Sequence, residues 1–507
     1  MEMRGSSVAE GSTGPGADQI GEHRLLIDGA LVGAVSGKTF PNVNPATEAI
    51  LGVTADAGAD DVDRAIAAAR RAFDTTRWST DHEFRQRCLL QLQDALEKER
   101  ESFRAELIAE CGAPVSTTYA AQIDWPIDDA VRWPAELIST FPWERALPDA
   151  DTFGMDSHRV VWKEAVGVVA AICPWNFPVE VMLNKVGPIL ATGNTLVLKP
   201  APDTPWSATR LGRLVAEHTD IPPGVVNVIA SSDHMVGERM VSDLRVDMVS
   251  FTGSTATGTR IASIAAPAMR RTFLELGGKS AMIVLEDADL ESAVPGSSLM
   301  CMHSGQGCAL QTRLLVPRSR YAEAVELATE SFRAIGIGDP MDPANMGGPL
   351  INARQRDRVL SYIEKGKTDG ARLTTGGGRV KGLDRGYFVE ATVFADVDNS
   401  MTIAQEEIFG PVLCVIPFED DDDAVRIAND SPYGLSAGVF AGDRDRAFAV
   451  SRRLRVGSVM VNGGLFYGAD APYGGYKASG TGRQCGIEGF EQHLQTKSLG
   501  YVDALDD

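Results

Sequence analysis

Residues 166–172 read VGVVAAI, and three further apolar runs follow: TLVL at 195–198, VVNVI at 225–229 and MVSF at 248–251. Each run is short and rich in β-branched residues, which favour extended strands. Segments with helical periodicity separate the runs, as at 180–191 and 206–217. This alternation predicts βαβ units and a parallel sheet that helices cover on both faces.

The alternation resumes after residue 276 and indicates a second α/β domain. Strands are predicted there at 281–285, 313–316 and 412–417, and helices at 321–335 and 352–369. A chain of 507 residues is too long for one hydrophobic core, so two or three domains are expected.

The ends of the chain carry smaller elements. Between residues 143 and 163 a polar stretch precedes alternating sequence, which predicts a hairpin that leaves the body of its domain, and 495–502 predicts one more strand. Near the N-terminus the patterns predict strands at 25–31 and 39–43 and helices at 60–75 and 88–111.

Composition excludes several kinds of partner. The formal net charge of −21 argues against nucleic acid or an anionic membrane as a ligand, although solubility alone would also explain it. The seven cysteines are odd in number, scattered, and form no CxxC or Cys/His cluster. We therefore predict no disulfide framework, no metal site and a reducing, cytoplasmic location.

Neither a signal peptide nor a membrane span is expected from the sequence. Residues 1–20 are rich in Gly, Ser, Asp and Glu and predict a disordered tail. The longest apolar run, 166–173, is far shorter than the roughly 20 residues that a spanning helix needs.

Two short stretches carry candidate chemistry. Residues 274–280 read LELGGKS and place Glu275 beside two glycines, and residues 305–308 read GQGC and place Cys308 after a glycine-rich turn. A thiol becomes an effective nucleophile when a base takes its proton or its pKa falls. For an arbitrary pair, the favoured interpretation is a structural cysteine and a surface glutamate. The surrounding motifs therefore decide between this interpretation and a catalytic pair.

Three of those motifs follow predicted strands. Residues 251–258, FTGSTATG, form a glycine-rich turn before a helical pattern that begins at Thr259, and such a helix start can hold a phosphate. Residues 174–178, PWNFP, hold an amide on a stiff loop that could stabilise an oxyanion. Lys199 follows 195–198, where α/β sheets bind ligands. Alone, each could be an ordinary turn, loop or surface lysine.

Two later stretches complete the set: EEIFGP at 406–411 and the glycine-dense PYGGYKASG at 472–480. In order and spacing, these motif stretches together resemble those of the aldehyde dehydrogenase superfamily, over about residues 25–502. The four stretches PWNFP, LELGGK, GQGC and EEIFGP are highly specific as a set. The resemblance implies oxidation of an aldehyde to a carboxylic acid.

The resemblance assigns the catalytic residues. Cys308 would attack the aldehyde to give a thiohemiacetal, whose oxyanion Asn176 and the Cys308 N–H would stabilise. Collapse to a thioester would pass hydride to a nicotinamide cofactor. Glu275 would then activate water to hydrolyse the thioester. Cys301 lies outside the motif and is expected in the core, and Lys185 matches a family position near the active site.

The resemblance also implies NAD as cofactor, with NADP as the alternative. Family members often carry a glutamate at the position of Pro202 that binds the ribose 2′-hydroxyl, and Asp203 follows it here, so the usual basis for strict NAD preference is weakened. Lys199 would reach the adenosine ribose, Gly253 and Ser254 the pyrophosphate, Glu407 the nicotinamide ribose, and Phe409 and Trp175 the nicotinamide end.

The substrate channel departs from the family pattern. Asn184 stands where some members have Trp, and Glu180 stands where an apolar residue is common. This predicts an aromatic but partly polar mouth, unless Glu180 faces solvent or pairs with a base, and His303 lies near where an Asn is often found. The predicted channel residues are Phe177, Glu180, Asn184, Phe466, Tyr467 and Tyr473.

The implied architecture is a Rossmann-like cofactor domain, an α/β catalytic domain and a small β hairpin for oligomerisation, in a homodimer or homotetramer. Two alternatives remain: a CoA-acylating semialdehyde dehydrogenase, which Glu275 disfavours, and a non-catalytic crystallin-like relative. Beyond the 1–20 tail, the predicted ranges are 21–145 and 165–275 for NAD(P) binding, 276–485 for catalysis, and 146–164 and 486–507 for oligomerisation.

Overall fold

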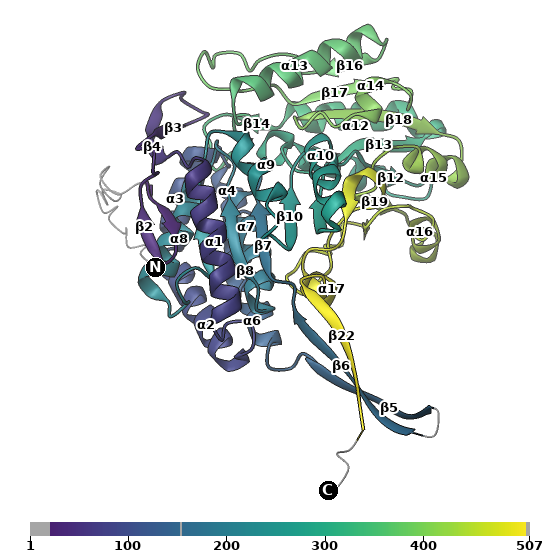
Figure 1. The fold of residues 1–507 in the computed structure, drawn as a ribbon. Helices are drawn as coiled ribbons and strands as arrows, with labels where there is room; N and C mark the ends of the chain where they lie inside the picture. The colour runs from purple at the N-terminus through teal and green to yellow at the C-terminus, as the bar shows by residue number, and fades with distance from the viewer. Residues whose placement is uncertain (1–20, 153–154, 503–507) are drawn as a thin grey trace, which may run out of the picture.

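The computed structural model describes residues 21–152 and 155–502 and forms two α/β layers with a projecting β arm (Figure 1). The predicted disordered tail, residues 1–20, lies outside the described residues. The first sheet has eight strands in the order β2 (Ala30–Val32), β1 (Leu25–Ile27), β9 (Val226–Val228), β8 (Thr195–Lys199), β7 (Val168–Ile172), β10 (Met248–Thr252), β11 (Arg271–Glu275) and β21 (Gly480–Thr481).

The strands β9, β8, β7, β10 and β11 of this sheet run parallel, and helices cover both faces, as the alternation predicts. Along β7, Val169 and Ala171 join one hydrophobic cluster while Val168 and Ala170 join the other. One cluster contains α2 (His82–Lys98), α3 (Arg100–Cys111), α7 (Pro178–Ala191) and α8 (Trp206–His218), and the other α1 (Ala59–Thr75), α9 (His234–Ser242) and α10 (Thr255–Ala265).

The second sheet has seven strands and its own two clusters, one on each face. Its strand order is β16 (Arg372–Thr375), β17 (Thr392–Ala395), β18 (Val412–Phe418), β13 (Gln311–Pro317), β12 (Ser280–Val284), β19 (Ser436–Phe440) and β20 (Ser458–Val461). α12 (Tyr321–Arg333) packs on one face, and α13 (Ala353–Thr368), α15 (Asp421–Asn429) and α16 (Arg444–Ser451) pack on the other.

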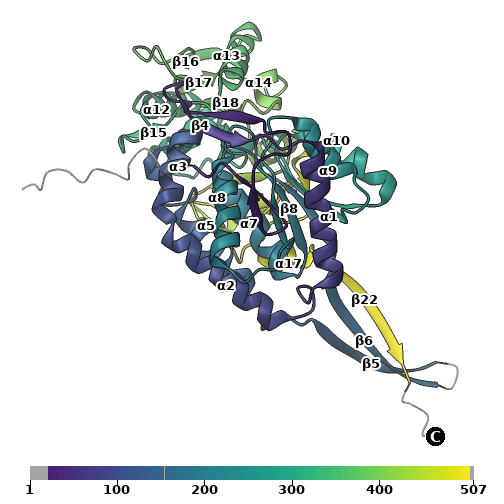
Figure 2. The same ribbon diagram turned by 60° about the vertical axis from the view of Figure 1, so that its left-hand side comes forward.

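A three-stranded antiparallel sheet forms the arm, which extends away from both α/β layers in two views (Figures 1 and 2). β5 (Glu144–Thr152) and β6 (Met155–Ala165) form the predicted hairpin, and the predicted C-terminal strand, β22 (Leu494–Tyr501), adds to β6. All seven β22 residues from Gln495 onward are exposed, so the arm has little core of its own.

The remaining described elements are short. Two small ribbons and several brief helices connect the layers: β3 (Thr39–Val43) with β4 (Ile50–Ala55), β14 (Gly336–Ile337) with β15 (Asn345–Gly347), α4 (Val115–Thr118), α5 (Asp124–Asp129), α6 (Arg132–Leu137), α11 (Leu290–Ala293), α14 (Thr402–Gln405) and α17 (Gly486–Glu491).

Three sequence predictions differ from the structure. The strand predicted at 25–31 is a hairpin, because Asp28 and Gly29 both take positive φ and reverse the chain. The helix predicted at 88–111 is two helices, divided at Glu99, whose φ of −101° and ψ of 13° are not helical. The Glu99 carboxylate pairs with Arg210 and Arg213 of α8. α10 begins at Thr255 rather than at Thr259, because the Ser254 hydroxyl accepts the Thr257 N–H as an N-cap.

A buried carboxyl, Glu110 at the end of α3, ties three elements together. It is fully buried and accepts hydrogen bonds from Asn42 Nδ2 (2.8 Å) in β3 and from the Trp206 N–H (3.1 Å) and the Ser207 hydroxyl (3.0 Å) at the start of α8. Burial, and then the nearby Glu106 charge, raise the pKa of Glu110 to about 8.

Candidate active site

The predicted catalytic residues meet where the two sheets face each other. Asn176 follows β7, Lys199 ends β8, and Glu275 ends β11, so all three lie at the carboxyl edge of the parallel strands. From the second sheet, Cys308 precedes β13 and Glu407 precedes β18. The loops that precede strands of the second sheet therefore meet the loops that follow strands of the first sheet.

Cys308 lies within reach of both a carboxylate and a phenol. Its Sγ is 3.9 Å from Oε1 of Glu275 and 3.4 Å from the hydroxyl of Tyr473. Burial, and then the charge of Glu275, raise the pKa of the Cys308 thiol well above its usual value. The resting nucleophile is therefore a thiol, and it needs a base to take its proton.

Glu275 is suited to that task. Its side chain is 3% exposed, and burial raises the pKa of its carboxyl. The buried Lys185, whose Nζ donates to the Ser250 hydroxyl at 3.1 Å, acts in the opposite direction on Glu275, while burial lowers the pKa of Lys185 itself. Once ionised, a carboxylate whose pKa is raised is a stronger base than a solvent-exposed carboxylate.

Asn176 is fixed toward the nucleophile loop. Its side-chain Nδ2 donates to the backbone carbonyl of Gln306 at 2.9 Å, and the backbone carbonyl of Asn176 accepts from Gln122 Nε2 at 3.2 Å. A side-chain amide has two N–H donors, so one remains for an oxyanion formed beside Cys308. The two prolines of the PWNFP loop, Pro174 and Pro178, frame this amide as the sequence predicts.

The nucleophile loop has an unusual backbone. His303, Ser304 and Gly305 take φ of 51°, 53° and 75° in succession, a left-handed run that costs energy for residues other than glycine. The side chain of Gln306 holds it in place, since Nε2 donates to the carbonyls of His303 and Pro349, both at 3.1 Å, and Oε1 accepts the Ile351 N–H at 2.9 Å.

The two glycines after Glu275 permit the close approach of both loops. A Cβ at Gly278 would lie 2.6 Å from the carbonyl oxygen of Cys308, and one at Gly277 would lie 2.2 Å from a carboxylate oxygen of Glu407. The Gly278 N–H donates to Glu407 at 2.9 Å. Packing around the nucleophile therefore requires glycine at 278, where the clash is with the backbone, whereas a side chain at 277 would displace the Glu407 carboxylate.

The residues expected to hold the cofactor's adenosine and pyrophosphate lie at the carboxyl edge of the first sheet. Lys199 is 5% exposed, its Nζ donates to the carbonyls of Pro200 (3.3 Å) and Ser231 (3.4 Å), and burial lowers its pKa to about 8. An ammonium has three donors, so one is spare. Gly253 and the exposed Ser254 form the start of α10, where helix N–H groups favour an anion.

The expected nicotinamide end is formed by aromatic and acidic residues. The rings of Trp175 and Phe409 meet edge-on at 5.4 Å, and Glu407 lies half-buried beside Gly278. These residues fit a dinucleotide cofactor. They offer a spare buried ammonium, a helix N-terminus, a carboxylate that can accept ribose hydroxyls, and an aromatic edge.

The expected channel residues form two groups. Phe466 stacks on Tyr473 at 6.1 Å between ring centroids, and Phe177 meets His303 edge-on at 6.0 Å. The polar group consists of Glu180 and Asn184 of α7 with Tyr467. Glu180 is 8% exposed, so the alternative that it faces bulk solvent is wrong.

Asp203, a candidate substitute for the missing glutamate, is engaged elsewhere. It accepts a hydrogen bond at 2.9 Å from Asn352, the N-cap of α13, while Pro202 is exposed. The carboxylate therefore contacts the second α/β layer, and Pro202 offers no carboxylate in its place.

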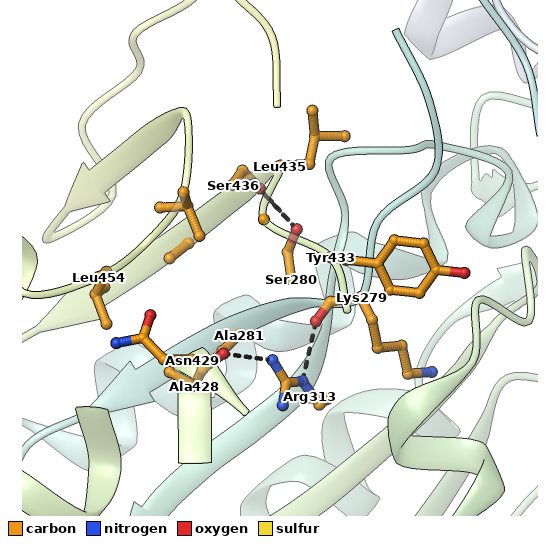
Figure 3. Close-up of a pocket in the computed structure, with 13 residues that line it drawn as sticks. Lys279, Ser280, Ala281, Arg313, Ala428, Asn429, Tyr433, Leu435, Ser436 and Leu454 are labelled. Atoms are coloured by element: carbon orange, nitrogen blue, oxygen red, sulfur yellow. Dashed lines mark hydrogen bonds between the residues drawn. The ribbon is translucent and has the colours of Figure 1, made fainter. Parts of the chain in front are cut away.

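A small pocket beside the glycine turn is separate from this site (Figure 3). None of the expected catalytic residues lines it. Its charged wall is Arg313, which donates to the carbonyls of Lys279 (2.9 Å), Ile427 (3.1 Å) and Ala428 (2.9 Å). Arg313 therefore ties β13 to the start of β12 and the end of α15 and has a structural role.

Sequence reasoning missed two contacts at the nucleophile. It placed Tyr473 in the channel wall but not beside the sulfur. It also gave no role to Cys111, whose Sγ lies 3.2 Å from the Trp175 carbonyl and 3.5 Å from Nε2 of His303. The Tyr473–Cys308 and Cys111–His303 contacts each join residues more than 150 positions apart, and no local pattern could reveal the contacts of Cys111. Cys301, expected in the core, is fully buried.

Comparison with known proteins identifies the family. The family model "Aldehyde dehydrogenase family" matches residues 32–499. The chain belongs to the aldehyde dehydrogenase family. A 3-succinoylsemialdehyde-pyridine dehydrogenase of Pseudomonas sp is 42% identical over 94% of this chain and 98% of that protein. Geranial dehydrogenase of Castellaniella defragrans is 40% identical, over 95% and 99% of the two chains.

Solved structures confirm the aldehyde dehydrogenase fold. A mutant of aldehyde dehydrogenase C from Pseudomonas syringae, in complex with NAD⁺ and octanal, superposes with a TM-score of 0.89, at 39% identity over 95% of this chain and 97% of that one. The aldehyde dehydrogenase of Mycobacterium tuberculosis, complexed with NAD⁺, gives a TM-score of 0.91 at 40% identity, over 96% of this chain and 100% of that one.

Among the helices within residues 21–152 and 155–502, none has both the length and the apolar composition that a membrane span requires.

Proposed function

We propose that this protein oxidises an aldehyde to a carboxylic acid with NAD(P)⁺, with NAD⁺ as the preferred cofactor. The observation that carries the proposal is the position of the Cys308 thiol, 3.9 Å from the buried carboxyl of Glu275 and on the loop that the Asn176 amide binds. In the overall reaction an aldehyde, NAD(P)⁺ and water give a carboxylic acid, NAD(P)H and a proton.

The first half of the reaction is acylation of the sulfur. Glu275 takes the thiol proton as Sγ of Cys308 bonds to the carbonyl carbon, and the carbonyl π electrons move to oxygen. The spare N–H of Asn176 and the Cys308 backbone N–H donate to that oxygen. NAD(P)⁺, when bound, supplies the acceptor for the hydride that leaves the carbonyl carbon.

The second half is hydrolysis. Glu275 first releases the thiol proton to solvent, which is the proton of the overall reaction. It then accepts a proton from water while the water oxygen bonds to the thioester carbon, and the Cys308 thiolate that leaves takes this proton back. The Asn176 amide again donates to the oxyanion. A base so close to the sulfur favours water over CoA as the acyl acceptor, which disfavours the acylating alternative.

Lys199, Gly253, Ser254, Glu407, Phe409 and Trp175 would hold the cofactor. Lys199 would donate to the adenosine ribose, the α10 N-terminus would meet the pyrophosphate, and Glu407 would accept from the nicotinamide ribose. NAD⁺ in the complexes of related enzymes supports NAD⁺ here. Pro202 leaves room for a 2′-phosphate, so NADP⁺ is the comparison to measure.

The test is absorbance at about 340 nm, where reduced nicotinamide absorbs, with a panel of aldehydes and each cofactor. Reduction of NAD⁺ without added CoA is expected. A strict requirement for CoA would replace the proposal with the acylating alternative. No reduction of either cofactor by any aldehyde would refute it and favour the crystallin-like alternative.

We also propose a homodimer or homotetramer in the cytoplasm. The projecting arm, whose β22 is almost wholly exposed, supports assembly, since an isolated three-stranded arm gains stability by pairing. The seven cysteines are free, which suits a reducing compartment. Light scattering of the purified protein tests the assembly, and a monomer would contradict it.

A further inference from the structure

Glu180, on α7, is a buried carboxyl with one oxygen unused. Both of its hydrogen bonds fall on Oε1, from Asn184 Nδ2 at 2.6 Å and from the Tyr467 hydroxyl. Oε2 has no donor among the residues that the structure describes, yet it is not one of the unpartnered atoms sealed from solvent. The side chain is 8% exposed, so this oxygen faces a confined space rather than bulk water.

Glu180 forms no ion pair within the described ranges. The charge of Lys185 acts on it only at longer range, because the Lys185 ammonium donates to Ser250 instead. The neutral groups of Asn184 and Tyr467 are its only hydrogen-bond partners. Burial accordingly raises the pKa of Glu180 to about 7. A buried carboxyl without a base is costly unless a ligand supplies the missing partner.

The surroundings of Glu180 favour a positive ligand. The ring of Trp125, in α5, lies 6.2 Å from that of Tyr467, which binds Glu180, and Trp125 is 42% exposed, so part of an aromatic side chain is accessible next to Tyr467. Nearby, Asp129 and Asp470 form no ion pair in the described part of the chain, and the charge of Asp470 contributes to raising the pKa of Asp129 and of Cys485. The net charge of −21 attracts cations to the whole molecule.

This cluster adjoins the nucleophile. Phe466, next to Tyr467 in the chain, stacks on Tyr473, whose hydroxyl is 3.4 Å from Cys308 Sγ. The charge of Glu180 raises the pKa of both Cys308 and Tyr473, so the carboxylate lies within electrostatic reach of the reacting sulfur. A substrate whose carbonyl meets Cys308 can therefore extend its far end toward Oε2.

We propose that Glu180, with Tyr467 and Trp125, binds a protonated amine at the far end of the aldehyde substrate, so that the enzyme selects cationic aldehydes. The ammonium N–H donates to Oε2 and the aromatic rings pack on its methylene or methyl groups. This inference rests on the proposed function and names the substrate class of the same site.

The test compares matched substrates. A series of ω-(dimethylamino)alkanals of increasing chain length is assayed beside carbon isosteres in which CH replaces the protonated nitrogen. For at least one length, the wild type should prefer the cation in kcat/KM. Glu180→Gln should lower the cation-to-isostere ratio by about 10- to 100-fold, the range for a hydrogen bond to a charged group. Glu326→Gln, which removes an exposed carboxylate on α12, should leave the ratio at its wild-type value.

The outcomes separate this inference from the proposed function. Oxidation of the isosteres with no preference for the cations at any length would overturn the inference and leave the dehydrogenase intact. Failure of all aldehydes would overturn the proposed function. If Glu180→Gln does not fold, the wild-type cation-to-isostere ratio over the same series of chain lengths still decides.

Discussion

The Tm advantage of Glu110→Gln over the wild type should grow as the pH rises. The carboxyl of Glu110 titrates at a pKa of about 8 in the fold, against 4.5 when unfolded. The folded state therefore binds the proton more tightly, and the stability that this proton provides is complete below pH 4.5 and is lost as the pH rises through 8. Glutamine has no proton to lose.

The size of the effect follows from these two pKa values. Relative to pH values below 4.5, the raised pKa of Glu110 destabilises the fold by about 1 kcal/mol at pH 5 and about 5 kcal/mol at pH 9, a difference of about 4 kcal/mol. At about 2 cal/mol/K per residue, unfolding 507 residues carries an entropy near 1 kcal/mol/K. The Tm advantage of Glu110→Gln over the wild type should thus grow by about 4 °C between these pH values.

Thermal unfolding of both proteins at about pH 5, 7 and 9 measures this. Any cost of the substitution that does not depend on pH, such as a weaker bond to Trp206 or Ser207, cancels between conditions. The control, Glu326→Gln, removes an exposed carboxylate and should give a constant Tm difference. A Glu110→Gln difference that stays constant, or that falls as the pH rises, would refute the assignment of Glu110 as a neutral buried acid.

Three predictions concern the reaction itself. Cys308→Ala should abolish turnover while NAD⁺ still quenches the protein's fluorescence with wild-type affinity, and residual turnover would count against the nucleophile. Asn176→Ala should slow the NADH burst in stopped flow by about 100- to 1,000-fold, the loss typical of one oxyanion donor, and a change below about tenfold would remove that role. Because the Tyr473 hydroxyl lowers the pKa of the Cys308 thiol, Tyr473→Phe should shift alkylation of Cys308 to higher pH, whereas an unmoved profile would contradict the 3.4 Å contact.

Much of the fold could be predicted because its signals are local. The strands β7, β8 and β10 are mainly apolar and buried at nearly every position, without alternation of polar and apolar residues, which indicates a sheet covered on both faces. The division at Glu99 could not be predicted, because no glycine or proline marks it and the ion pair that Glu99 forms there joins it to α8, far away in the sequence. Tertiary contacts of this kind leave no trace in local periodicity.

The site shows the same limit. Cys308, Glu275 and Asn176 were identified by motif, and the structure brings the first two within 3.9 Å. The contact of Tyr473 with the sulfur and the free oxygen of Glu180 could not be predicted, since each depends on how α7 and residues 466–473 meet. Those contacts, rather than the motifs, carry the information about the substrate.

The most direct test of the account is pre-steady-state kinetics of Glu275→Gln. If Glu275 activates water, acylation should still proceed to about one NADH per subunit, more slowly than in the wild type because the Cys308 proton has lost its acceptor. Steady-state turnover should then fall by at least about 100-fold, the contribution of a general base. Steady-state turnover at the wild-type rate would contradict the central claim.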